Sequence, residues 1–166
     1  DMVSSCNSLK PVPGRLEYVG KTKKGALVYV DFAHTPDALK HLLETLRELT
    51  KGELVLVFGA GGERDRDKRK PMGAVAYKYC DLIYVTDDNP RYEDANFIRK
   101  QIIEGCPIAI EIEDRAEAIT TAIQLARLDD VVIIAGKGHE QVQIVRDNYF
   151  PFSDFEQASV AIELMD

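Results

Sequence analysis

The stretch Leu82-Ile83-Tyr84-Val85-Thr86-Asp87-Asp88-Asn89-Pro90-Arg91-Tyr92-Glu93 joins a short apolar run to an abrupt cluster of polar residues. The apolar run is typical of a buried strand. In an open α/β sheet, ligands bind at the carboxyl ends of the strands. Pro90 holds Asn89 extended, and Arg91 presents a planar fork that suits a carboxylate. The same residues can also simply end a strand, and their spacing alone leaves both interpretations open.

Apolar runs and amphipathic stretches alternate along most of the chain. Strands are expected at residues 16–19, 27–32, 53–58, 82–85, 108–112 and 131–135, with a β-ribbon around 143–150. Helices are expected to begin at residues 36, 71, 96, 115 and 154. This alternation predicts a Rossmann-like three-layer α/β domain, in which a mostly parallel sheet carries helices on both faces.

Three of the expected helices begin with capping residues. Thr35 suits an N-cap because its hydroxyl can accept a backbone N–H. Asp114 with Glu117, and Ser153 with Glu156, have the spacing of capping boxes.

Composition excludes several classes of protein. The 166 residues are 45% hydrophobic and 30% charged with a net charge of -7, which is ordinary for a globular protein and argues against a nucleic-acid surface. No apolar run approaches the roughly 18 residues that a membrane span needs. Cys6, Cys80 and Cys106 lack metal-ligand spacing, and so sparse a set fits a reducing compartment. We therefore expect a cytoplasmic protein with no nucleic-acid or membrane partner.

The first 13 residues show no periodicity and carry two prolines. They are interpreted as a linker or the end of a preceding central domain, and residues 14–166 as one domain. The chain begins at Asp1 without an initiator methionine, which suggests a fragment.

The segment Gly20-Lys21-Thr22 resembles part of a phosphate-binding loop. That motif needs a glycine five positions before Gly20, where this chain has Arg15, and Gly14 is one residue too early. No helical pattern follows Thr22. The segment is therefore predicted to be a hairpin turn.

Four charged or glycine-rich segments follow successive predicted strands, at residues 31–37, 59–70, 87–93 and 136–140. The topology would bring them to one edge of the sheet. The second has three glycines and then five basic residues, which favours an anion site over a solvated loop. The four segments contain no serine or cysteine nucleophile with a paired base and no metal-ligand cluster. We expect a binding surface for small molecules of both charge signs, such as a zwitterionic amino acid and a nucleotide phosphate.

Five motifs occur here in the order and spacing that they have in the Mur ligases, and the resemblance runs from about residue 5 to the end. They are Val12-Pro13-Gly14-Arg15, Val30-Asp31-Phe32-Ala33-His34-Thr35-Pro36-Asp37, Phe58-Gly59-Ala60-Gly61-Gly62-Glu63-Arg64-Asp65, Asp88-Asn89-Pro90-Arg91 and Ala135-Gly136-Lys137-Gly138-His139-Glu140. The chain thus resembles the carboxyl-terminal domain of such ligases. Their phosphate-binding loop, carbamylated lysine and magnesium ligands lie in a central domain that this chain does not resemble.

The resemblance implies an ATP-dependent ligase of peptidoglycan biosynthesis. It would add meso-diaminopimelate to UDP-N-acetylmuramoyl-L-alanyl-D-glutamate through an acyl phosphate. This part would bind the incoming amino acid and close over ATP, whose Mg²⁺ would be held mainly by the central domain. The isolated chain is expected to be monomeric and inactive.

The family's residue roles transfer to matching positions. The amino-acid recognition motif falls on Asp88, Asn89, Pro90 and Arg91, and further contacts to diaminopimelate fall on Arg64, Gly136 and Glu140. Nucleotide contacts are implied for Arg15, Asp31 and His34.

Three other functions stay open. A lysine-adding relative would depart from arginine at position 91, and a folylpolyglutamate synthetase should lack the motif at 88–91 altogether. A non-catalytic amino-acid-binding module is the third alternative, and an upstream phosphate-binding loop in the parent gene would exclude it.

Overall fold

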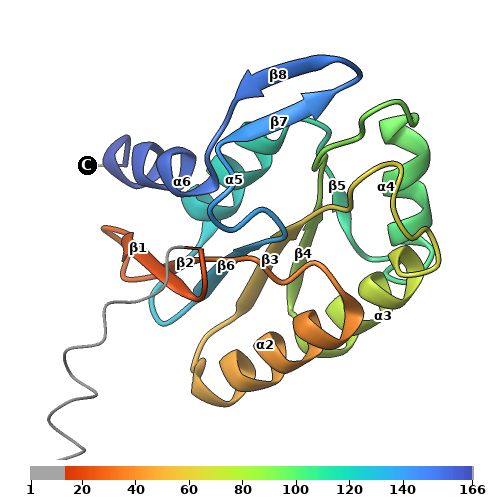
Figure 1. Ribbon diagram of the computed structural model, residues 1–166. Helices are drawn as coiled ribbons and strands as arrows, with labels where there is room; N and C mark the ends of the chain where they lie inside the picture. Colours follow the sequence, from red (N-terminus) through yellow and green to blue (C-terminus); the bar gives the residue numbers. More distant parts are fainter. Residues whose placement is uncertain (1–13, 166) are drawn as a thin grey trace, which may run out of the picture.

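A six-stranded sheet lies between two layers of helices in the computed structural model, which describes residues 14–165 (Figure 1). The proposed linker at residues 1–13 lies outside the described residues. The strands lie in the order β1-β2-β6-β3-β4-β5. Their bounds are β1 Glu17–Lys21, β2 Leu27–Asp31, β3 Leu54–Phe58, β4 Leu82–Val85, β5 Ile110–Glu111 and β6 Val131–Ala135. The predicted three-layer α/β fold is confirmed.

All neighbouring strands are parallel except β1, which runs antiparallel to β2. The last residues of four adjacent strands are paired in register: Asp31 with Ala135, Ala135 with Phe58, and Phe58 with Val85. The four segments that follow these strands therefore start from one edge of the sheet.

Helices cover both faces of this sheet. One face carries α2 (Pro36–Leu49), α3 (Arg69–Tyr79) and α4 (Ala95–Ile103), and the other carries α5 (Arg115–Leu125) and α6 (Asp154–Glu163) (Figure 1). Alternate residues of the central strand β6 enter the two cores, with Ile133 in the first and Val132 and Ile134 in the second. Because both faces are buried, this strand is a continuous apolar run in the sequence.

The predicted N-caps are present. The side chains of Thr35, Asp114 and Ser153 accept the backbone N–H groups three residues ahead, at 3.3, 2.9 and 3.3 Å. The helix predicted to start at Pro71 instead begins at Arg69. A proline fits there because N–H groups of the first helical turn have no acceptor within the helix.

The edge strand β5 is shorter than predicted, and the Gly20–Thr22 segment has the predicted hairpin. The strand expected at 108–112 is reduced to β5, a two-residue edge strand paired with Tyr84 and Val85. The Gly20–Thr22 segment ends β1 in a hairpin, as predicted, with Thr22 N–H donating to the Ala26 carbonyl at 2.8 Å.

The predicted ribbon consists of β7 (Val142–Val145) and β8 (Asn148–Pro151), which form a separate antiparallel pair (Figure 1). It is bonded to the segment that follows β4. Arg91 N–H donates to the Ile144 carbonyl at 3.1 Å, and Arg146 N–H donates to the Arg91 carbonyl at 2.9 Å. The segment after β4 thus extends the ribbon locally.

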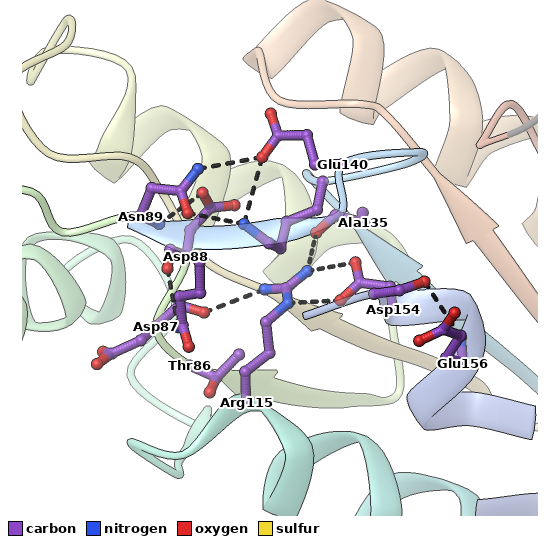
Figure 2. A network of polar contacts seen from close by, with 12 residues as sticks. Thr86, Asp87, Asp88, Asn89, Arg115, Ala135, Glu140, Asp154 and Glu156 are labelled. Carbon is purple, nitrogen blue, oxygen red and sulfur yellow. Dashed lines mark hydrogen bonds and ion pairs between the residues drawn. The ribbon is translucent and has the colours of Figure 1, made fainter. Parts of the chain in front are cut away.

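A fully buried ion pair joins the two helices on one face to the sheet. Arg115 donates from Nε and Nη2 to the two carboxylate oxygens of Asp154, at 2.7 and 2.8 Å, and neither side chain is exposed. The same guanidinium donates to the carbonyls of Asp87 and Ala135, at 3.2 and 3.1 Å (Figure 2). One side chain therefore links the first residues of α5 and α6 to the carboxyl ends of β4 and β6.

No helix within residues 14–165 is long and apolar enough to span a membrane.

Replacing Asp154 by alanine should lower the free energy of unfolding by about 3–5 kcal/mol, because it leaves the Arg115 guanidinium buried without its counter-ion. Urea unfolding measures this change. The control is Lys70→Ala, which breaks an exposed pair with Glu104 and should cost less than about 1 kcal/mol. Equal losses in the two variants would contradict the role given to the buried pair.

Candidate functional site

A cavity of about 420 Å³ opens at the carboxyl edge of the sheet. Residues that follow β2, β3, β4 and β6 line it, as the strand order requires. Its lining includes seven residues singled out from the sequence, namely His34, Arg64, Asp88, Asn89, Arg91, Gly136 and Glu140. Three of the predicted residues, Arg15, Asp31 and Pro90, are outside this lining.

The glycine-rich loop after β3 lies directly against the backbone of the segment after β4. Gly62 N–H donates to the Asn89 carbonyl at 2.8 Å. A Cβ atom on Gly62 would lie 1.8 Å from the Pro90 carbonyl oxygen, and one on Gly59 would lie 2.3 Å from the Thr86 carbonyl oxygen. Only glycine permits such an approach. Buried Pro90 thus supports the wall of the pocket from behind.

Arg91 is held at both its backbone and its side chain. Its φ of 53° is in the left-handed region, which L-residues rarely adopt. Nη1 donates to the carbonyls of Gly62 and Asn89, at 2.9 and 3.4 Å. A Cβ atom on Gly61 would lie 3.1 Å from Nη1, so this glycine leaves room for the guanidinium. Arg64 is exposed at the same pocket, which gives it a second guanidinium.

Asn89, Glu140 and Lys137 form a hydrogen-bonded triangle. Asn89 Nδ2 donates to Glu140 Oε2 at 3.1 Å, and Lys137 Nζ donates to Asn89 Oδ1 at 2.8 Å and to Glu140 Oε2 at 3.2 Å. Figure 2 shows Asn89 and Glu140 facing each other from different segments of the chain. Lys137 was not predicted as a site residue. The two glycines that flank it indicated only backbone amides near an anion, and its burial depends on contacts with residues distant in the sequence.

Asp88, next to Asn89 in the chain, also lines the pocket and is nearly buried. Its Oδ1 accepts the N–H of Asn89 at 2.7 Å, and its Oδ2 would lie 3.1 Å from a Cβ atom on Gly136. Gly136 has a φ of 116°, so both its conformation and its contact with Asp88 require glycine.

Lys68 adds a cation to the lining of the same pocket. Its Nζ donates to the His34 carbonyl at 2.8 Å. Burial lowers the pKa of Lys68, while the nearby Asp88 carboxylate opposes that change.

The residues implied in nucleotide binding gather beside the pocket around Phe32. The guanidinium of Arg15 lies 5.0 Å from the Phe32 ring centre, and the His34 ring lies 4.4 Å from it. Asp31 is buried, and its two oxygens accept the N–H groups of Ala33 and Leu16, both at 2.7 Å. An aromatic ring, an imidazole and a guanidinium beside glycine backbone suit a nucleotide. The nucleotide roles of Arg15, Asp31 and His34 stay predictions.

Residues 14–138 match the family described as "Mur ligase, glutamate ligase domain". The chain belongs to the Mur ligase family. Its fold also resembles a solved "UDP-N-acetylmuramoyl-L-alanyl-D-glutamate--2,6-diaminopimelate ligase", with a TM-score of 0.86 and 37% identity over 98% of this chain and 34% of that one.

Curated relatives of this Mur ligase domain carry the same enzyme name. The ligases of Agrobacterium fabrum and Caulobacter vibrioides are 52% and 49% identical to it over 149 and 165 residues. These matches cover 90% and 99% of this chain but 30% and 34% of the relatives, so the chain spans about a third of their length. A bifunctional folylpolyglutamate synthase/dihydrofolate synthase from Yersinia pestis shares the fold, with a TM-score of 0.63 at 23% identity over 93% of this chain and 32% of that one.

Potential metal ligands within residues 14–165 do not cluster, and both cysteines of this part are buried. No group of three or more His, Cys, Asp or Glu side chains in this part could hold a metal ion. Cys80 and Cys106 are buried, and burial raises the pKa of the Cys106 thiol to about 11. Burial raises the pKa of the Cys80 thiol as well, so both thiols stay protonated at neutral pH and are poor nucleophiles.

The five basic residues at 64–70 do not all serve the pocket. Arg64 and Lys68 line it, whereas Arg69 is fully buried and points to Glu93. Arg69 Nη1 and Nη2 donate to the Glu93 carboxylate at 3.0 and 3.1 Å, and Nη2 also donates to the Gly61 carbonyl at 3.1 Å. Arg69 thus ties the glycine-rich loop to the end of the segment after β4.

Glu93 is held in its charged form by this arrangement. The hydrogen bonds from Arg69 are the main cause that lowers its pKa to about 2, and Glu63 N–H also donates to it at 2.5 Å. Because the folded-state pKa lies below the ordinary 4.5, the stabilisation is present above pH 4.5 and is lost as the pH falls toward 2.

The difference in Tm between the native chain and Glu93→Gln should be largest at neutral pH and should shrink between pH 4.5 and pH 3. Thermal unfolding across this range measures it. Glu104→Gln, in an exposed pair with Lys70, is the control and should show a small difference at every pH. A Glu93→Gln effect of constant size from pH 7 to pH 3 would show that the carboxylate charge is not responsible.

Proposed function

We propose that this chain binds the incoming amino acid in an ATP-dependent ligase that adds meso-diaminopimelate to UDP-N-acetylmuramoyl-L-alanyl-D-glutamate during peptidoglycan synthesis. One observation carries the proposal: a single cavity of about 420 Å³ is lined by two arginines and a glutamate from three separate strand ends. Relatives about 50% identical to the chain bear the name of that ligase.

The charges of the pocket match those of the proposed ligand. Diaminopimelate has an amino-acid head at each end, so it carries a second carboxylate and a second ammonium. Arg91 and Arg64 can donate to a carboxylate, and Glu140 can accept from an ammonium. Lysine lacks the second carboxylate and would leave Arg91 without a carboxylate partner.

The chemical role of these residues is to hold and orient the nucleophile. ATP would convert the dipeptide carboxylate to an acyl phosphate with release of ADP, and attack by the amine of the bound amino acid would form the amide bond and release phosphate. Arg15, Asp31 and His34 would contact the nucleotide, while the Mg²⁺ ligands would come mainly from the part of the relatives that this chain does not match. The isolated chain would be a cytoplasmic monomer without ligase activity.

A folylpolyglutamate synthetase is disfavoured by the complete Asp88-Asn89-Pro90-Arg91 motif, and a lysine-adding ligase is disfavoured by Arg91. Its guanidinium is positioned by the Gly62 carbonyl and lines the cavity, which suits a substrate with a second carboxylate. A non-catalytic module is disfavoured by the family membership.

The full-length protein should release phosphate from ATP when it receives the UDP-muramoyl dipeptide and meso-diaminopimelate. L-lysine in place of diaminopimelate should give little turnover, because Arg91 would be desolvated without a carboxylate partner. A phosphate-release assay with both amino acids measures this. Equal turnover with lysine would refute the proposed substrate.

Arg91→Ala in the full-length protein should raise the KM for diaminopimelate by an amount equivalent to about 2–5 kcal/mol, because it leaves the second carboxylate unpaired. Steady-state kinetics measures the change. Arg127→Ala is the matched control, since Arg127 is exposed and precedes β6 at the opposite edge of the sheet. An unchanged KM in Arg91→Ala would remove Arg91 from the amino-acid site.

A further inference from the structure

Lys137 is a fully buried cation immediately behind the pocket. It follows β6, and the glycines on both sides of it have positive φ angles of 116° and 55°. Its side chain has 0% exposure. A buried ammonium is stable only when it is paired and hydrogen-bonded. Nζ meets this need through Asn89 Oδ1 at 2.8 Å and Glu140 Oε2 at 3.2 Å.

These contacts determine which end of the Asn89 amide faces the pocket. Oδ1 accepts from Lys137 Nζ and from Ile144 N–H, the latter at 3.0 Å. A rotated amide would set its own NH₂ group against two other donors. Nδ2 is therefore directed to Glu140 Oε2, at 3.1 Å.

The same contacts orient Glu140. Its Oε2 receives hydrogen bonds from both Lys137 and Asn89, while its other carboxylate oxygen points away from Asn89 (Figure 2). The Glu140 side chain is 35% exposed and lines the cavity. Lys137 is enclosed, so any effect that it has on a ligand acts through these two neighbours.

We propose that Lys137 is a positioning residue that holds Glu140 ready to accept the second ammonium of the amino acid. It thereby makes the site selective for a ligand with that ammonium over an analogue without it. The inference rests on the proposed function, since it assigns a selectivity to the same pocket.

Lys137→Met in the full-length protein tests this with two ligands. One is meso-diaminopimelate, and the other is 2-aminopimelate, which keeps both carboxylates but has a single amino group. The KM for diaminopimelate should rise about tenfold, the effect of weakening one charge-assisted hydrogen bond, with kcat less affected. The inhibition constant of 2-aminopimelate should change by less than about threefold, since that ligand does not use Glu140. An equal change for both ligands, or no change for either, overturns the inference.

A double variant keeps the test valid if Lys137→Met unfolds. Lys137→Met with Glu140→Gln removes opposite charges together, so no buried charge remains unpaired. If Lys137 acts through Glu140, the double variant should match Glu140→Gln in its KM for diaminopimelate. A further tenfold rise in the double variant overturns the inference.

Lys100→Met, on the exposed side of α4, controls for the loss of a lysine. Its KM for diaminopimelate and its inhibition constant for 2-aminopimelate should equal those of the native protein. Failure of the native protein to use diaminopimelate would refute the proposed function itself. Turnover of diaminopimelate with unaltered selectivity in Lys137→Met would refute only the role of Lys137.

Discussion

The buried pair of Arg115 and Asp154 is the constraint on which the functional edge of the sheet depends. Parallel strands leave carbonyl groups at their carboxyl ends, and those that are buried need donors. Arg115 supplies donors to the ends of β4 and β6 while its charge is balanced by the first residue of α6. The position of the C-terminal helix is thereby linked to the strand ends that carry the pocket.

The pocket has an outer set of charged side chains, which line the cavity, and an inner set, which is buried in the protein behind it. Arg64, Arg91 and Glu140 line the cavity, while Arg69, Lys137 and Arg115 lie behind it with essentially no exposure. Each inner cation is paired with a carboxylate. Side chains that meet a ligand are most effective when other groups have already fixed their positions. Binding energy is then not consumed in ordering the site.

The three layers, the order of the strands along the chain and most helix starts could be predicted, because they follow from local patterns in the sequence. β6 is apolar throughout because both its faces are buried, and Thr35, Asp114 and Ser153 have capping hydroxyl or carboxylate groups. The inner charges could not be predicted in this way. A lysine or arginine in a polar loop is usually exposed, and only contacts distant in sequence, such as Arg69 with Glu93 or Lys137 with Asn89, make it a buried one.

The ribbon of β7 and β8 shares its hydrogen bonds with the segment that carries Arg91. Gln143 Nε2 donates to the Asp88 carbonyl at 2.9 Å, and the backbone of Ile144 contacts both Asn89 and Arg91. A shift of one residue along β7 would exchange its inward and outward side chains. The length of this hairpin can therefore change without a shift in register only at its tip, between β7 and β8. Insertions within β7 would displace the contacts that hold Asn89 and Arg91 at the pocket.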